Sequence, residues 1–225
     1  MFPAFLGGID FFFIFCKSSP TGYALLKMNR PLSFVPHVNK LVKACFAVIR
    51  RLYSISHLLT QQQLKSLVCC KIFSNLDYCN SLLFGLNEST IRKLQRVQNS
   101  AARLIIRRGP PMSLRKFFFD SHWLRIRDRI IYKIILVVHN SLQLRGPDGL
   151  IKLLSYTDSG RTMKLKETRV NSRFGSRAFS HAGPKIWNLL PLEIRYESKT
   201  DAFKKLLKSY LLIHGDELNA RLKIK

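Results

Sequence analysis

The sequence predicts a mainly α protein, an irregular helical bundle with a basic extended segment near residues 160–175 and helices at its C-terminal end. Apolar residues recur at steps of three and four positions through most of residues 36–213, which is the period of amphipathic helices. Clusters of proline and glycine separate these stretches. The 225 residues, 47% of them hydrophobic, suffice to bury one core and to leave room for a small second unit.

We divide the chain into three parts. Residues 1–30 form an apolar N-terminal segment and linker, residues 31–145 a helical region, and residues 146–225 a tail with a basic arm and terminal helices. The first 16 residues are apolar but interrupted by Asp10, have no basic residue before the apolar run, and are shorter than the roughly 20 residues that span a bilayer. A poorly formed signal or anchor and an unselected start of translation are both open, and we favour the second.

The charge predicts a polyanionic partner. The chain has 38 Lys and Arg against 13 Asp and Glu, a formal net charge of +25. Because the cations are spread over the chain and not held in one cluster beside an apolar span, RNA or DNA is favoured over an anionic membrane surface. We expect binding with weak sequence specificity and an intracellular location, in the nucleus or cytoplasm.

In the first third, periodicity predicts a helix from Pro36 to about His57, with Lys40, Lys43, Arg50 and Arg51 on its polar face. Thr60 and Gln63 resemble a capping box that opens a second helix through Ile72. The stretch 75–86 is expected to be a buried short helix that ends at Gly85.

The clearest helix is predicted from Ser89 to Arg108. Its apolar stripe consists of Ile91, Leu94, Val97, Ala101, Leu104 and Ile105. Opposite this stripe, four arginines share a sector of roughly 60° at 100° per residue; they are Arg92, Arg96, Arg103 and Arg107. This arginine stripe could follow a phosphate backbone, or it could be an ordinary solvated face.

The second half predicts a helix from Ile126 to Leu144, with isoleucines and Val138 inward and Arg127, Arg129 and Lys133 outward. Residues 160–175 alternate basic with apolar residues or threonine, which indicates an extended strand or a mobile basic arm. Further helical segments are expected at 150–154, 177–190 and 200–213. In the last of these, the inward residues would be Phe203, Leu206, Leu207, Tyr210 and Leu211, with Gly215 beyond its end.

Catalytic patterns are missing from the sequence. It has no carboxylate pair of the kind that holds two metal ions, no phosphate-binding glycine loop, no G-x-S-x-G and no H-E-x-x-H. The six histidines are scattered, and the five cysteines form neither a zinc pattern nor a disulfide framework, so buried free thiols are expected. The sequence therefore predicts no enzyme activity, cofactor, metal site or small-molecule substrate.

Aromatic residues among the cations are candidates for stacking on bases. They are Phe117, Phe118, Phe119, Trp123 and Phe174. For Trp123 and Trp187, core packing is favoured because aliphatic residues adjoin them.

Four blocks in order resemble the C-terminal region of the reverse transcriptases of non-LTR retrotransposons, of the jockey and chicken-repeat (LINE) type. The blocks are LDYCNSLLFGL (76–86), IRKLQRVQNSAARLI (91–105), HWLRIRDRIIYKI (122–134) and GSRAFSHAGPKIWNLLPLEIR (175–195). The resemblance covers about residues 31–213. Arg125 stands where the family has proline and Gly183 where it has alanine, which fits drift in a decaying copy.

The resemblance implies a helical thumb and a tail without the catalytic palm of the polymerase. Such a chain would not copy nucleic acid but could hold template and primer, and it could contact the rest of a retroelement polymerase. The residues expected to contact nucleic acid are Arg92, Arg96, Arg103, Arg107, Arg127, Lys133, Arg173 and Arg177. Two other readings stay open: a product of a degenerate insertion without function, and a membrane-associated basic protein anchored by residues 1–16.

Overall fold

The computed structural model describes residues 34–157, 162–170, 172 and 175–222. In this part of the chain the backbone is mainly helical, and its extended pairing is a single antiparallel bridge between Tyr156 and Leu165. The predicted helical fold class is therefore confirmed. Residues 1–16, Arg173 and Phe174, which the sequence had singled out, lie outside the described residues.

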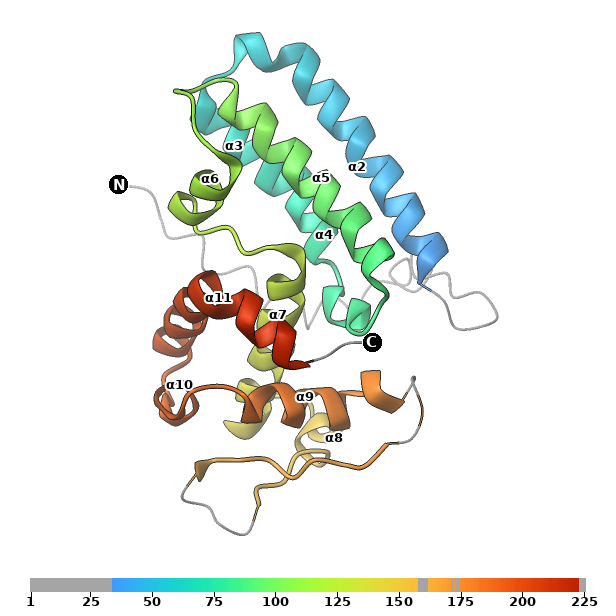
Figure 1. Cartoon of the computed structure of the whole chain (residues 1–225), viewed down its shortest axis with the longest axis vertical. Helices are drawn as coiled ribbons and strands as arrows, with labels where there is room; N and C mark the ends of the chain where they lie inside the picture. Colours follow the sequence, from blue (N-terminus) through green and yellow to red (C-terminus); the bar gives the residue numbers. More distant parts are fainter. Residues whose placement is uncertain (1–33, 158–161, 171, 173–174, 223–225) are drawn as a thin grey trace.

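Two long helices form one side of the molecule. Helix α2 (Val35–Ile55) and helix α5 (Glu88–Ile106) lie side by side in the upper half of Figure 1. All six residues of the predicted apolar stripe of α5 are buried, as the periodicity indicated. The side chain of Asn87 caps α5 by accepting a hydrogen bond from the backbone N–H of Thr90.

A second helical rod runs from Gln61 to Asp77 beneath this pair. It consists of α3 (Gln61–Val68), a π-helical turn (Cys69–Phe73) and α4 (Ser74–Asp77). The predicted capping box of Thr60 and Gln63 is present. The single short helix predicted at 75–86 is wrong, because Cys79 adopts a left-handed conformation with φ 49° that ends the rod. A 3₁₀ turn (Asn80–Leu83) follows, and Gly85, with φ 71°, turns the chain toward α5.

Helix α6 (Leu114–Asp120) was not predicted. It ends at Asp120, and the left-handed φ of 52° at His122 lets the backbone N–H of Trp123 bond to the carbonyl of Phe118 at 2.8 Å. This turn folds Trp123 back into the core, where its ring meets Phe73 and Phe117 edge-on with centroids 4.3 and 5.2 Å away. The predicted core role of Trp123 is confirmed, as is that of Trp187, which is 1% exposed.

Helix α7 (Ile126–Leu142) is the central element. It packs against α5, α8, α9, α11 and the 3₁₀ turn, and its isoleucines are buried as predicted. The prediction that Arg129 points outward is wrong, because a helix surrounded by five elements has little solvent face. The Arg129 side chain is 17% exposed, pairs with Asp77, and lies 4.6 Å over the ring of Phe73.

The basic extended segment is docked on the C-terminal helices in the lower half of Figure 1. Helix α8 (Asp148–Ile151) precedes it in the chain, and helices α9 (Phe179–Asn188) and α10 (Leu192–Tyr196) follow it and bond to it. The amide of Asn188 bonds both the N–H and the carbonyl of Leu165, at 2.8 and 2.9 Å, and Trp187 donates to the carbonyl of Met163 at 2.9 Å. Residues 155–157 thus pair with this segment on one edge, and side chains of α9 hold its other edge.

The last helix, α11 (Thr200–Leu222), is nine residues longer than predicted. Gly215, expected beyond the helix end, lies inside it. Leu206, expected to face inward, is 45% exposed, because it lies outside the buried stripe of the helix. That stripe includes Phe203, Leu207, Leu211, Gly215 and Leu218. One continuous hydrophobic cluster includes residues on both sides of the predicted boundary at 145.

Candidate nucleic-acid interface

Helices α2 and α5 run parallel and in register. The ammonium of Lys93 donates to Oδ1 of Asn39 at 2.7 Å near their first turns, and the guanidinium of Arg107 lies 5.4 Å from the ring centroid of Tyr53 near their last turns. Both contacts join residues 54 positions apart in the sequence. The polar faces of the two helices therefore run together along one side of the molecule.

The arginine stripe of α5 lies on this side. Arg92, Arg96, Arg103 and Arg107 are all exposed, as expected from their position opposite the apolar stripe. From Arg92 to Arg107 the stripe extends over 15 residue steps, or roughly 22 Å at a rise of 1.5 Å per residue. Since each strand of a duplex has one phosphate per about 3.4 Å of the duplex axis, that length matches about six phosphates.

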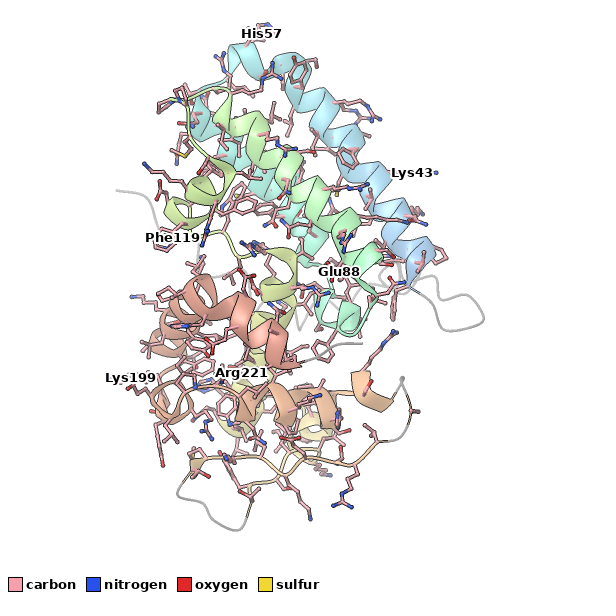
Figure 2. The ribbon with its side chains drawn as sticks, viewed as in Figure 1. Lys43, His57, Glu88, Phe119, Lys199 and Arg221 are labelled. Carbon is pink, nitrogen blue, oxygen red and sulfur yellow. The ribbon has the colours of Figure 1, made fainter. Side chains whose placement is uncertain are left out.

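Helix α2 contributes four more exposed cations, Lys40, Lys43, Arg50 and Arg51. Together with the four arginines of α5 they form what we call the basic face. The periodicity had placed these α2 residues on a polar face but had not assigned them to the site. The missing information was tertiary, because only the parallel pairing of the two helices joins the two stripes. Figure 2 shows Lys43 on the outer side of α2.

The basic face is nearly free of acids. Residues 34–76 contain no Asp or Glu, and in α5 the single acid is Glu88 at the first turn. Glu88 forms an ion pair with Arg127 and a weaker exposed pair with Arg92, 3.4 Å between Oε1 and Nε. The other seven cations of the face therefore lie away from this carboxylate, since they are on later turns or on α2.

The remaining predicted residues have different surroundings. Arg127 is half-buried and ion-paired with Glu88. Burial lowers the pKa of the half-buried Lys133. Arg177 packs against the backbone of Gly85, where a Cβ would lie 2.8 Å from its Cγ. These three side chains are therefore less accessible to a phosphate than the four arginines of the stripe. Arg173 lies outside the described residues.

The aromatic candidates separate into core and surface. Phe117, Phe118 and Trp123 are buried in the core, so their faces are not open to a base. Phe119 is 57% exposed at the end of α6, and Tyr53 is 54% exposed beside Arg107. Tyr53 was not among the predicted residues, because nothing in the sequence indicates that α2 and α5 meet at this point.

Neither a metal site nor a membrane-spanning helix is present in the part of the chain that the structure describes. No group of three or more His, Cys, Asp or Glu side chains in this part of the chain is placed to hold a metal ion. None of the described helices combines the length and the apolar character needed to cross a membrane. Among the described cysteines the thiols are free; Cys45 is buried, which raises its pKa to about 11, whereas Cys70 is exposed.

No family model matches the chain, and comparisons with curated proteins and with solved structures give no match either.

Proposed function

We propose that the protein is a non-catalytic nucleic-acid-binding module, related to the thumb and tail of non-LTR retrotransposon reverse transcriptases. The basic face of α2 and α5 holds the sugar–phosphate backbone of RNA or DNA. One observation carries the proposal: eight exposed cations lie on two parallel, in-register helices, and one acid is present at the end of one helix. A face with this density of positive charge favours a polyanion over any neutral ligand.

Contacts of this kind are electrostatic and ignore sequence. Each phosphate neutralised by Lys or Arg releases counterions, so the logarithm of affinity falls with the logarithm of salt concentration by about 0.9 per contact on a duplex. Six contacts predict a slope of about −5. Six of the eight cations are arginines, whose planar guanidinium groups can contact phosphate oxygens bidentately.

The test is fluorescence anisotropy of the full chain with a labelled single strand, a duplex and an RNA–DNA hybrid over a range of salt. The variant Arg96→Glu with Arg103→Glu reverses the centre of the stripe. A matched control, Lys199→Glu with Lys205→Glu, changes the net charge equally on exposed residues just before α11 and in its second turn. Figure 2 shows Lys199 in the half of the molecule away from α2.

We expect the stripe variant to lose more than tenfold in affinity and its salt slope to become shallower by about 2, since two contacts are removed. The control should lose only the small part that comes from net charge. Equal losses in both variants would show that total charge and not the basic face holds the ligand. Binding that hardly changes with salt would refute the proposal itself.

The proposed origin has a separate test in the flanking genomic sequence. An upstream reading frame, broken or intact, that encodes a polymerase palm supports it. Flanking sequence that encodes an unrelated protein in the same frame contradicts it.

A further inference from the structure

A cavity of about 520 Å³ lies between α6, the start of α7 and the middle of α11. Its volume falls within the range of about 300–1,000 Å³ that ligand pockets occupy. Its walls are mainly apolar and include Phe118, Trp123, Leu124 and Leu211. The cavity is separate from the basic face, because no residue of that face lines it.

The inner wall of the cavity carries an acid. Asp128 is 5% exposed, and Oδ1 accepts a hydrogen bond from the amide of Asn219 at 2.7 Å, the one hydrogen bond to this carboxylate among the described residues. Burial raises the pKa of Asp128 to about 6, against the hydrogen bond and the nearby charges of Arg125 and Arg127. The group is therefore mostly ionised at neutral pH but has fewer donors than buried carboxylates usually have.

The mouth of the cavity is aromatic and cationic. The exposed ring of Phe119 borders it, and Figure 2 shows this residue where α6 approaches α11. Arg115 and Lys116, both exposed on α6, line the same opening. Arg125 also lines it, but its guanidinium is engaged with Asp216 at 2.6 Å. Two cations are thus open to an anionic group at the mouth, while Asp128 lines the wall inside.

We propose that this cavity binds one unpaired guanine of the nucleic acid. The base stacks on Phe119, its N1–H and 2-amino groups donate to the carboxylate of Asp128, and its phosphate lies near Arg115 and Lys116. The inference rests on the proposed function, because it adds a base-reading site to a chain that already holds the backbone.

The chemistry selects guanine over the other bases. Guanine presents two adjacent N–H donors on its Watson–Crick edge, which match the two oxygens of a carboxylate. Adenine and cytosine have one amino group beside a ring nitrogen that accepts, and uracil has one N–H between two carbonyls, so each would place an acceptor against the carboxylate. Unpaired bases stacked on aromatic rings and read on this edge are the usual basis of sequence-specific RNA recognition.

The test compares three labelled eight-nucleotide RNAs: oligouridylate, and the same strand with one central guanosine or one central adenosine. Anisotropy with the full chain at fixed, moderate salt should show the guanosine strand binding about tenfold more tightly, the size expected for one bidentate base contact. The adenosine strand should bind like oligouridylate.

Asp128→Asn should abolish this preference, because Asn219 holds the remaining carbonyl oxygen and the new amide would face the donors of guanine. Asp120→Asn, on an exposed residue of α6 outside the cavity, raises the net charge equally and should keep the preference. Phe119→Ala, a change at the surface, should reduce it severalfold. In the wild-type chain, the preference should also shrink between pH 7.5 and pH 5, since Asp128 gains a proton.

Equal affinity of the three RNAs, with the salt dependence retained, would overturn the guanine site and leave the basic face standing. A preference that survives in Asp128→Asn to the extent seen in Asp120→Asn would also overturn it. If Asp128→Asn does not fold, the other two measurements decide. The guanine site is then overturned if the preference for the guanosine strand is unchanged both in Phe119→Ala and in the wild type at pH 5. Loss of salt-dependent binding by all three RNAs would instead refute the proposed function.

Discussion

Gly215 of α11 lies directly against the buried carboxylate of Asp128 on α7. A Cβ at position 215 would lie 2.8 Å from Oδ1 and 2.9 Å from Cγ of Asp128. Gly215→Ala in an ordinary helix interior would stabilise by up to about 1 kcal/mol. Here we expect a loss of about 2 kcal/mol in the free energy of unfolding, because a buried contact becomes overpacked.

Urea denaturation of the full chain measures this change. Gly149→Ala in α8 is the matched control, since a Cβ there would meet nothing within 4 Å. It should leave stability unchanged or raise it slightly. A stabilised Gly215→Ala variant would contradict the close packing of α11 on α7.

The carboxyl of Asp128 predicts a pH dependence of stability. Its pKa in the folded chain is about 6, above its ordinary value of 3.8, so the folded state binds the proton more tightly. Between pH 4 and 6 the wild type should therefore gain stability, relative to Asp128→Asn, as the pH falls. The difference between the two chains should change by about 2 to 3 kcal/mol from pH 7.5 to pH 4. Parallel urea curves at several pH values measure it, and a constant difference would be inconsistent with a buried carboxylate.

Leu144 is a site at which glycine should stabilise the chain. It has a left-handed φ of 55° just after α7, and the N–H groups of Leu144 and Arg145 bond to the carbonyls of Ser141 and Asn140 in a Schellman arrangement. Because its side chain is 76% exposed, Leu144→Gly loses little burial and removes the strain, so we expect a gain of about 1 kcal/mol.

The control is Leu58→Gly, at a residue that is 74% exposed but is not left-handed. It should destabilise the chain slightly. Differential scanning calorimetry would show the midpoint rising for one variant and falling for the other. Movement in the same direction for both would argue against the left-handed turn.

The pair of Arg129 and Asp77 predicts a difference between two similar cations. Nε of Arg129 donates to Oδ1 of Asp77 at 2.8 Å, a second guanidinium nitrogen contacts Oδ2, and the Phe73 ring lies beneath. Arg129→Lys keeps the charge but loses the two-pronged contact and the flat stacking, so we expect a loss of about 1 to 2 kcal/mol. The figure is moderate because Asp77 is partly exposed.

Arg92→Lys is its control, since the pair of Arg92 with Glu88 is exposed on both sides. It should cost less than about 0.5 kcal/mol. Equal effects of the two substitutions in chemical denaturation would show that Arg129 is no more constrained than a surface residue.

The sequence predicted correctly the features that depend only on residue spacing within one helix. The stripe of α5 and the capping box at Thr60 need only spacing within one helix, and both are present. The breaks were harder to predict, because Cys79 and His122 adopt left-handed conformations that their residue types do not demand. Residue type also misled at Gly215: glycine suggested a helix end, whereas the packing of α11 on Asp128 requires this glycine inside the helix.

The candidate site was half predictable. The arginines of α5 could be identified from periodicity, but the contribution of α2 depends on a pairing over 54 positions that no local pattern encodes. The cavity could not be predicted from the sequence, because Phe119, Asp128 and Ile213, which line it, come from three different helices. In the sequence, Asp128 is one acid in a basic stretch. Only its burial in the structure distinguishes it from the other acids.

The constant separation of 54 residues between Asn39 and Lys93 and between Tyr53 and Arg107 also determines where the chain can tolerate changes in length. Deleting one residue in the middle of α2, such as Ala47, would turn everything after it by about 100° and carry Arg50 and Arg51 away from the arginines of α5. A residue added among Gly109, Pro110 and Pro111 would leave both helices untouched. In genomic copies of related sequences, insertions and deletions should therefore gather in that loop wherever binding has been under selection.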